Sequence, residues 1–306
     1  MSYARITLVR CVGLFRSYRL EKSMMIFGEP RSGSTWLMEL LAHSGNCIVV
    51  WEPTHPNLGL NPAQYKGEPR IFEDPSETNT LLSRDICDIL TLKKFNKWTL
   101  NHTTFRSIVY SRNTLTKLVH GTLLLPWILV NVPLAYQPIY IVRHPIAMAL
   151  SQMKGGMYME REMMSDKTFR RLYPDRYDEY REFIIKLKSP LEKLVALWCL
   201  YLKHLIQHTN KSDKLIFIHY EDLLMNPFGE LKKICVLWGI DLDIAALDIR
   251  KPSKTDFHKQ LKGDPMKQLS KWQHQVSAAE KERIQGILDY FKIDLYNANS
   301  ALPIKS

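Results

Sequence analysis

One segment of the sequence combines a cation, hydroxyl groups and glycines at spacings that suit a phosphate-like anion. In MMIFGEPRSGSTWL, Arg31 lies three residues before Ser34, which Thr35 follows. Gly28 and Gly33 have the spacing of a nucleotide-binding P-loop, although Ser34 stands where that motif has lysine. A strand that runs into a glycine turn and a helix points several backbone N–H groups at one place. The segment therefore predicts a P-loop-like anion site.

A second segment predicts another anion site. The apolar run 138–142 ends at Arg143, and Ser151 follows eight residues later on an expected helix. If that helix begins at Pro145, Ser151 lies about two turns along it and faces the same side as Arg143. An arginine fork and a hydroxyl that converge in this way suit a phosphate dianion. The alternative for Arg143 is an ion pair with a nearby carboxylate.

Three residues near the ends of expected strands could take a proton from an acceptor group. Glu52 directly follows the second apolar run of the chain, His55 lies three residues further on, and His120 comes shortly after Lys117. Glu52 is the first choice for the general base, and His120 and His55 are the alternatives, since reach decides between them. Lys117 is a candidate second catalytic cation. The structural alternative for Glu52 is an ion pair with Arg31.

These residues need a scaffold that gathers them, and the order of elements supplies one. Apolar runs typical of strands alternate with helical patterns, and the expected strands are 24–27, 47–51, 115–119, 138–142 and 214–219. The expected helices are 36–42, 79–92, 145–153, 227–238 and 278–291. This alternation predicts a three-layer α/β fold, with a central parallel sheet and helices on both faces. Ligands of such sheets bind at the carboxyl ends of the strands, where the candidate residues fall.

The two anion motifs resemble those of sulfotransferases that use 3′-phosphoadenosine-5′-phosphosulfate (PAPS). Residues 30–36, PRSGSTW, resemble the family's 5′-phosphosulfate loop, and Arg143 with Ser151 resembles its 3′-phosphate motif. The resemblance implies that residues 31–35 contact the phosphosulfate and that Trp36 packs near the adenine. The phosphosulfate contacts would thus come from Arg31, Ser32, Gly33, Ser34 and Thr35. An arginine in place of lysine at position 31 resembles the carbohydrate-type and bacterial branch.

Further matches extend the resemblance over about residues 24–291. The segment that begins YEDL at Tyr220 resembles a family element beside the cofactor, and Lys271-Trp272 resembles a C-terminal element that covers the nucleotide. The Gly-x-x-Gly-x-x-Lys element of small-molecule members is absent, and residues 262–264 are at most a fragment of it. Tyr220 and Lys271 are therefore candidate cofactor-binding residues.

The resemblance implies an enzyme that moves the sulfuryl group of PAPS to a hydroxyl or amine of an acceptor. The acceptor is expected to be a carbohydrate or a small natural product, the product nucleotide is 3′-phosphoadenosine 5′-phosphate (PAP), and no metal is expected. One alternative is a P-loop kinase or NTPase, which predicts a lysine at position 34 and a Walker-B aspartate. The other is a sulfotransferase-like protein that binds nucleotide without turnover.

Composition and charge limit the other possibilities. The 306 residues carry a formal net charge of +11, which favours an anionic partner, but no zinc-finger or RNA-recognition signature accompanies it. No nucleic-acid partner is therefore expected. Residues 1–23 are expected to form a basic arm that lies on the domain or on a membrane surface, and 24–306 a single domain with a helical insertion at about 154–190. The aromatic and charged insertion is more typical of an amphipathic cap than of an acceptor-binding wall.

Location in the cell follows from cysteines and hydropathy. The five cysteines are scattered and show no metal-ligand spacing, so they are interpreted as reduced core thiols of a cytoplasmic protein. The uncharged segment 121–142 is long enough to span a bilayer, but three prolines interrupt it. A short helix, a turn and a strand are expected there instead, and no transmembrane span.

Overall fold

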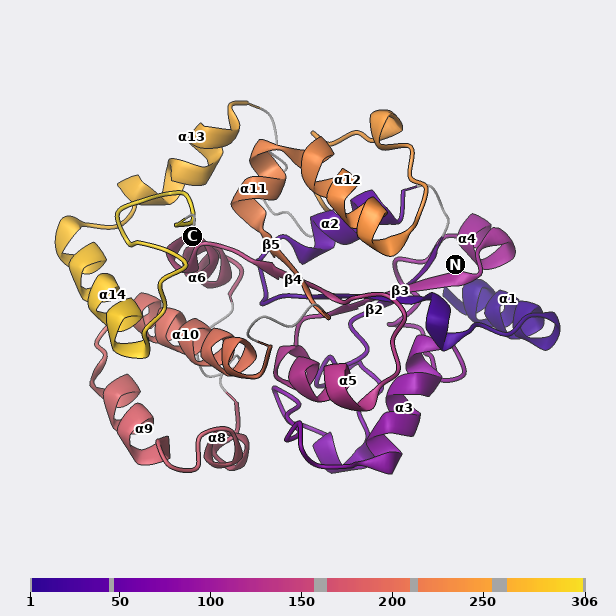
Figure 1. The fold of residues 1–306 in the computed structure, drawn as a ribbon, viewed down its shortest axis with the longest axis horizontal. Helices are drawn as coiled ribbons and strands as arrows, with labels where there is room; N and C mark the ends of the chain where they lie inside the picture. The colour runs from indigo at the N-terminus through magenta and orange to yellow at the C-terminus, as the bar shows by residue number, and fades with distance from the viewer. Residues whose placement is uncertain (1, 44–46, 157–163, 210–213, 255–262, 305–306) are drawn as a thin grey trace.

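Five parallel strands form one central sheet in the computed structural model (Figure 1). The described residues are 2–43, 47–156, 164–209, 214–254 and 263–304. The strand order is β2-β3-β1-β4-β5, with bounds Ser23–Phe27 (β1), Cys47–Trp51 (β2), Asn113–Leu118 (β3), Ile139–Val142 (β4) and Ile216–His219 (β5). The predicted parallel α/β sheet is confirmed, and the strand ends differ from the expected ones by one or two residues.

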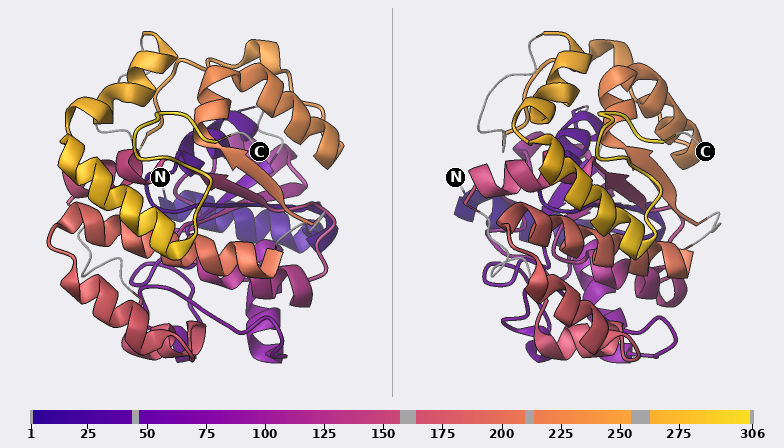
Figure 2. Two further views of the ribbon diagram at one scale, coloured as in Figure 1. Left: turned by 60° about the vertical axis from the view of Figure 1, so that its left-hand side comes forward. Right: turned by 90° about the vertical axis from the view of Figure 1, so that its left-hand side faces the viewer.

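Helices cover both faces of the sheet, which confirms the three-layer prediction (Figure 1). One face carries α2 (Ser34–Leu41), α11 (Tyr220–Met225) and α12 (Pro227–Trp238). The other face carries α3 (Thr80–Leu90), α5 (Leu125–Asn131), α6 (Pro145–Lys154), α10 (Pro190–Thr209) and α14 (Ala278–Phe291). Helix α14 packs along α10 (Figure 2). The remaining α-helices described are α1 (Ser2–Phe15), α4 (Phe105–Tyr110), α8 (Asp166–Leu172), α9 (Tyr177–Lys186) and α13 (Pro265–Ser270).

The two layers arise because successive strand residues point to opposite faces of the sheet. In β1, Met25 and Phe27 enter the core on the α10 face, and Met24 and Ile26 enter the core on the α2 face. All five residues of β1 are buried, as expected for a central parallel strand covered on both sides. The anion loop that follows β1 is thus attached to the most enclosed strand of the sheet.

The basic N-terminal segment is a helix that packs on the domain beside β2. Val9 of α1 is buried in a small core with Ile48 and Ile108, and Arg5 donates a hydrogen bond to the carbonyl oxygen of Asn101 (2.9 Å). Helices α1 and α4 are in contact. Cys11 of α1 is exposed, so the expectation that the cysteines lie in the core is wrong for this residue.

Other expectations about segments outside the sheet can be checked too. The apolar stretch at 121–142 forms α5 and β4, and within the described ranges no helix is long and apolar enough to cross a bilayer. All five cysteines are free thiols. The expected insertion at about 154–190 contributes α8 and α9, while its residues 157–163 lie outside the described part of the chain, as does Lys262.

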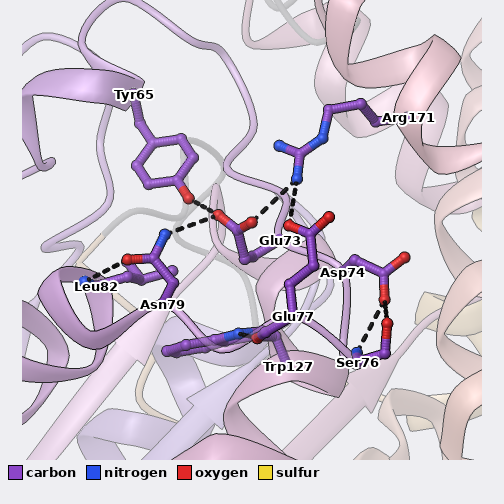
Figure 3. A network of polar contacts seen from close by, with 9 residues as sticks. All are labelled: Tyr65, Glu73, Asp74, Ser76, Glu77, Asn79, Leu82, Trp127 and Arg171. Carbon is purple, nitrogen blue, oxygen red and sulfur yellow. Dashed lines mark hydrogen bonds and ion pairs between the residues drawn. The ribbon is translucent and has the colours of Figure 1, made fainter.

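The long loop between β2 and α3 is held down by a buried carboxylate. Glu73 accepts hydrogen bonds from Tyr65 and Asn79, and Arg171 of α8 bridges Glu73 (3.0 Å) and Glu77 (3.1 Å) (Figure 3). Because these contacts tie the loop to a distant helix, its far end is anchored independently of the sheet. The near end of the same loop carries two candidate bases.

Candidate active site

A cavity of about 530 Å³ opens at the carboxyl ends of the strands, and nearly all predicted site residues line it. The predicted residues in its lining are Arg31, Gly33, Ser34, Thr35, Trp36, Glu52, His55, Lys117, His120, Arg143, Ser151, Tyr220 and Lys271. The exception is Ser32. Residues that the sequence reasoning missed include Trp51, Trp98, Lys154, Gln268 and Gln275, while Trp272 lines the cavity beside Lys271.

The anion loop depends on Gly33 for its shape. Gly33 is the N-cap of α2 with φ 96°, a left-handed conformation that favours glycine. A Cβ atom there would lie 2.3 Å from Cδ2 of Tyr220, so a side chain at this position would also collide with the ring. The first amides of α2 have no partner inside the helix, and they begin at the cavity wall with Ser34 and Thr35. The loop is built to present N–H groups to an anion.

Ser32 has a different place from the one expected. Its side chain is buried under the loop, where Oγ lies close to Gly28, and its backbone N–H donates to the carbonyl oxygen of Glu29 (3.0 Å). Ser32 is thus outside the cavity lining, and its Oγ has no hydrogen-bond partner among the described residues.

The two predicted anion motifs meet in the structure. Nε of Arg31 donates to Oγ of Ser151 (3.0 Å), and Arg143 donates to the carbonyl oxygen of Arg31 (3.0 Å). The Gln152 side chain donates to the carbonyl oxygen of Pro30 (2.9 Å), a contact that the sequence did not indicate. Helix α6 therefore fastens the loop after β1 to the loop after β4. One ligand could bridge the two anion sites.

Aromatic rings and buried carboxylates support the second motif. The guanidinium of Arg143 lies over the Tyr220 ring (4.5 Å to its centroid), and Trp36 meets the same ring edge-on (6.1 Å). Glu221, the residue after Tyr220, accepts a hydrogen bond from the backbone N–H of His144 (2.9 Å). Burial raises the pKa of the Glu221 carboxyl group. The contact fixes the residue that follows Arg143 and so orients the arginine.

The cavity lining fits an anionic ligand. Nε1 of Trp36, Nε of Arg143 and Nε1 of Trp272 are buried N–H groups with no hydrogen-bond partner among the described residues. Such groups are rare in native proteins unless a ligand or water pairs them. Among the residues that the structure describes, one carboxylate, that of Glu52, lines the cavity together with five cationic side chains: Arg31, Lys117, Arg143, Lys154 and Lys271. The charge and the unpaired donors both suit a ligand that carries several negative charges.

Glu52 is held by its neighbours on the opposite wall. Its carboxylate forms an ion pair with Lys117 and accepts the backbone N–H of Val119 (3.0 Å). The indole N–H of Trp98 donates to the backbone carbonyl oxygen of Glu52 (3.1 Å). The backbone of Glu52 is left-handed, with a φ of 41°. The Lys117 ammonium also lies 4.2 Å from the centroid of the Trp51 ring. The ion pair anticipated for Glu52 thus exists, but with Lys117 and not with Arg31.

The two candidate histidines have opposite tautomers. Nδ1 of His55 accepts the backbone N–H groups of Asn57 (3.3 Å) and Leu58 (3.2 Å), so in the neutral ring the proton is on Nε2. Nδ1 of His120 lies 3.2 Å from the carbonyl oxygen of Pro69 and must donate to it. The neutral His120 ring therefore has its lone pair on Nε2, which can accept a proton.

Burial keeps both rings neutral. It lowers the pKa of His120 to about 3, with further lowering by Arg70, His55 and Lys117, and it also lowers the pKa of His55. His55 and His120 have ring centroids 5.3 Å apart. Near neutral pH the Nε2 atom of His120 therefore carries a lone pair, and the Nε2 atom of His55 carries a hydrogen.

The buried histidines predict acid sensitivity of the fold. Burial lowers the pKa of His102 and His144 to about 4, and of His120 and His204 to about 3, from 6.5. The unfolded chain takes up protons as the pH falls through about 6.5, and the native histidines do not, so the free energy of unfolding decreases from there to about pH 4. The thermal midpoint is expected to fall steadily over this range.

Differential scanning calorimetry at a series of pH values tests this expectation. Buried Glu29 and Glu221 act in the opposite sense, because their raised pKa values let the native state hold protons that the unfolded state has lost. His204→Leu removes one buried histidine that does not line the cavity and is expected to make the pH dependence shallower. A midpoint that stays constant from pH 7 to 4.5 would contradict the prediction.

No metal centre is evident in the described portion of the chain, where no three His, Cys, Asp or Glu side chains gather as a ligand set. The sheet and the glycine-turned loop after β1 define a P-loop-like α/β protein.

The chain belongs to the sulfotransferase family, since the model described as "Sulfotransferase family" matches residues 24–243. The comparison with curated proteins finds no match.

The comparison with solved structures lists several sulfotransferases. The sulfotransferase domain from the curacin biosynthetic pathway is 16% identical, with a TM-score of 0.47 over 90% of this chain and 98% of that chain. Mouse sulfotransferase SULT7A1 complexed with PAP is 13% identical, with a TM-score of 0.46 over 94% and 90%. The sulfotransferase domain from the Synechococcus PCC 7002 olefin synthase is 20% identical, with a TM-score of 0.44 over 90% and 95%.

Proposed function

We propose that the protein transfers the sulfuryl group of PAPS to a hydroxyl or amine of an acceptor. The observation that carries the proposal is the direct contact of Arg31 with Ser151, which joins two anion sites in one cavity beside proton-accepting groups. PAPS would supply an activated sulfuryl group and two phosphate ends of matching charge. Family membership supports this chemistry over that of a P-loop kinase.

The residues of the nucleotide side have distinct roles in this proposal. Arg143 and Ser151 would hold the 3′-phosphate, because a guanidinium fork and a hydroxyl suit a dianion. Arg31, with the amides and hydroxyls of Ser34 and Thr35, would hold the 5′ end and stabilise charge on the leaving phosphate. The adenine would pack in the aromatic corner of Trp36 and Tyr220, and Lys271 would cover the nucleotide.

The acceptor side offers His120 as the proton acceptor. The sequence favoured Glu52, but both Glu52 carboxylate oxygens already have hydrogen-bond donors, whereas Nε2 of His120 has none among the described residues. Glu52 would then hold Lys117, whose charge would act on the sulfuryl oxygens. Catalysis of this kind rests on positioning and electrostatics, as in phosphoryl transfer.

The walls around His120 suggest the class of acceptor. Trp51, Trp98 and His55 present ring surfaces at this end of the cavity. Aromatic walls beside the ion pair of Glu52 and Lys117 suit a sugar or an aromatic natural product that brings a neutral hydroxyl or amine. We propose an acceptor of this class and a cytoplasmic enzyme.

Transfer of label from radiolabelled PAPS to a panel of sugars, phenols, lipids and peptides tests the proposal. Label is expected in a sugar or phenol fraction, with magnesium or with a chelator, because the roles above require no metal. Labelling from γ-labelled ATP, lost in chelator, would favour a kinase. Tight PAP binding without transfer to any acceptor would favour a binding protein.

A second prediction isolates the 3′-phosphate site. PAP is expected to bind at least about tenfold more tightly than adenosine 5′-phosphate, since charge-assisted hydrogen bonds contribute about 1.5–3 kcal/mol each. Arg143→Ala should abolish this preference while leaving adenosine 5′-phosphate affinity nearly unchanged. Isothermal titration calorimetry gives both values, and Arg170→Ala, at an exposed arginine of α8 outside the cavity lining, is the matched control. Equal affinities for the two nucleotides in the wild type would rule out this assignment.

A further inference from the structure

A buried ion pair lies directly beneath the anion loop. Arg70, on the loop between β2 and α3, is 2.8 Å from the carboxylate of Glu29, and their side chains are 1% and 3% exposed. Glu29 is two residues before Arg31, and it also accepts a hydrogen bond from the hydroxyl of Thr122 (2.7 Å). Arg31, the catalytic cation of the proposed reaction, therefore lies two residues after a carboxylate that forms an ion pair with Arg70.

The same arginine also holds the opposite wall of the cavity. A guanidinium nitrogen of Arg70 donates to the carbonyl oxygen of Val119 (2.7 Å), the residue before His120. The residues on either side of Arg70 both bond His120. Pro69 accepts from its ring, and the N–H of Ile71 donates to its backbone carbonyl (3.4 Å). Position and ring orientation of His120 are thus set from one short stretch of chain.

A buried ion pair is weak evidence for a gain in stability, because replacing the pair by apolar side chains of similar volume often leaves the free energy of unfolding unchanged or raises it. A guanidinium differs from them in offering several N–H donors in one rigid plane. Arg70 uses this plane to reach Glu29 and Val119 together, and its face packs on Tyr201 of α10 (4.8 Å). The arrangement ties the loop after β1 to the segment after β3, and the hydrogen bond from Thr122 to Glu29 joins the same two segments directly.

We propose that Arg70 is a positioning residue that sets Arg31 and His120 at the separation required for sulfuryl transfer. This inference rests on the proposed function and deepens it. Arg70 does not line the cavity, so its effect passes through Glu29 on one side and Val119 on the other. Misplacement of reacting groups by about 1 Å can cost about 10²-fold in rate, which sets the scale expected here.

Arg70 also places its charge close to His120. The charged and titratable groups that face His120 are Arg70 and His55 on the loop and Lys117 on β3, with Glu52 paired to Lys117. Loss of the Arg70 charge should raise the pKa of His120, and a change of geometry alone should not. Lysine in place of Arg70 keeps the positive charge but cannot contact Glu29 and Val119 together as the guanidinium does. This variant therefore separates the effect of charge on the pKa of His120 from the effect of geometry on the rate.

Three variants test the inference: Arg70→Lys, the double variant Arg70→Met with Glu29→Gln, and the control Arg171→Met. The double variant leaves no unpaired buried charge and is expected to fold. Both Arg70 variants should lower kcat by about 10–10²-fold, with the dissociation constant of PAP within about threefold of wild type. Arg171 anchors the other end of the same loop (Figure 3), and its loss should change kcat by less than about threefold.

Titration of His120 by NMR measures the pKa of its ring, which would not change if Arg70 had only a structural role. Its pKa should rise in the double variant and stay near the wild-type value in Arg70→Lys. Near-normal kcat in both Arg70 variants, or an equal loss of kcat and PAP affinity in all three proteins, would overturn the inference. A wild-type protein that transfers no sulfuryl group would overturn the proposed function itself, and an active wild type with active Arg70 variants would overturn only the role of Arg70.

Discussion

Arg31→Ala is expected to lower kcat for sulfuryl transfer by about 10²–10³-fold, the usual effect of removing a preorganised group that stabilises developing charge. Arg31 is suited to this role because it lies between the two anion sites. Its Nε is already oriented by Ser151, and its carbonyl oxygen accepts from Arg143. Its left-handed φ of 72° shows that the loop, not the side chain alone, determines its direction. Single-turnover measurements with saturating PAPS would report the chemical step.

Arg31→Lys is the matched variant for this prediction. A lysine keeps the charge as a point and loses the Nε–H that contacts Ser151. Partial activity is expected, above that of Arg31→Ala and below that of the wild type. If Arg31→Ala loses PAP affinity and keeps kcat at saturation, Arg31 contributes to ground-state binding only, and its assignment to the transition state is wrong.

The carboxyl ends of the strands were the part of the site most accessible to sequence reasoning. Arg31, Arg143 and Glu52 each follow a short apolar run, and parallel strands must end at the same edge of the sheet. Adjacency in the fold therefore followed from local pattern. The sequence also indicated that Gly33 shapes the loop. It did not indicate the second reason for a glycine there, which is the closeness of the Tyr220 ring. Tyr220, whose ring approaches Gly33, is the first residue of α11, nearly two hundred residues further along the chain.

The missed features depend on packing between distant segments. Ser32 and Ser34 differ by two positions in the loop, and only the left-handed turn between them directs one downward and the other into the cavity. The long helix α10 was not among the expected elements, and its apolar residues occupy nearly every side because it is buried along most of its length. Trp98 reaches the cavity from an irregular segment without any strand-end signal.

The sequence could not show which candidate is the base, for a related reason. Glu52, His55 and His120 all fall where a base could lie, and all three line the cavity. What separates them is which of their atoms already has a partner. Those partners are mostly backbone groups, namely the amides after His55 and the carbonyl of Pro69, and no residue type signals them. Tautomers can be read only once the chain is folded.

His120→Asn is expected to lower kcat by about 10²–10⁴-fold, the usual contribution of general-base catalysis. Asparagine is the sharpest replacement, because its amide N–H can occupy the place of Nδ1 and keep the bond to Pro69 while Nε2 is lost. PAP affinity should change little, since His120 lies on the acceptor side. The acid limb of the wild-type pH–rate profile should fall well below pH 6.5, because burial lowers the pKa of His120 and the neutral ring is the active form.

Glu52→Gln is the comparison that decides the assignment. Glutamine keeps an oxygen for the N–H of Val119 and removes the charge opposite Lys117, so a base at Glu52 would be lost and a base at His120 would remain. With His120 as the base, Glu52→Gln should cost less than His120→Asn, and its effect should come through a misplaced Lys117. Lys117→Met in the Glu52→Gln background would then add little further loss, because the two residues act as a unit. If Glu52→Gln instead abolishes turnover and His120→Asn stays near normal, the carboxylate takes the proton, and Lys117 must leave it when PAPS binds.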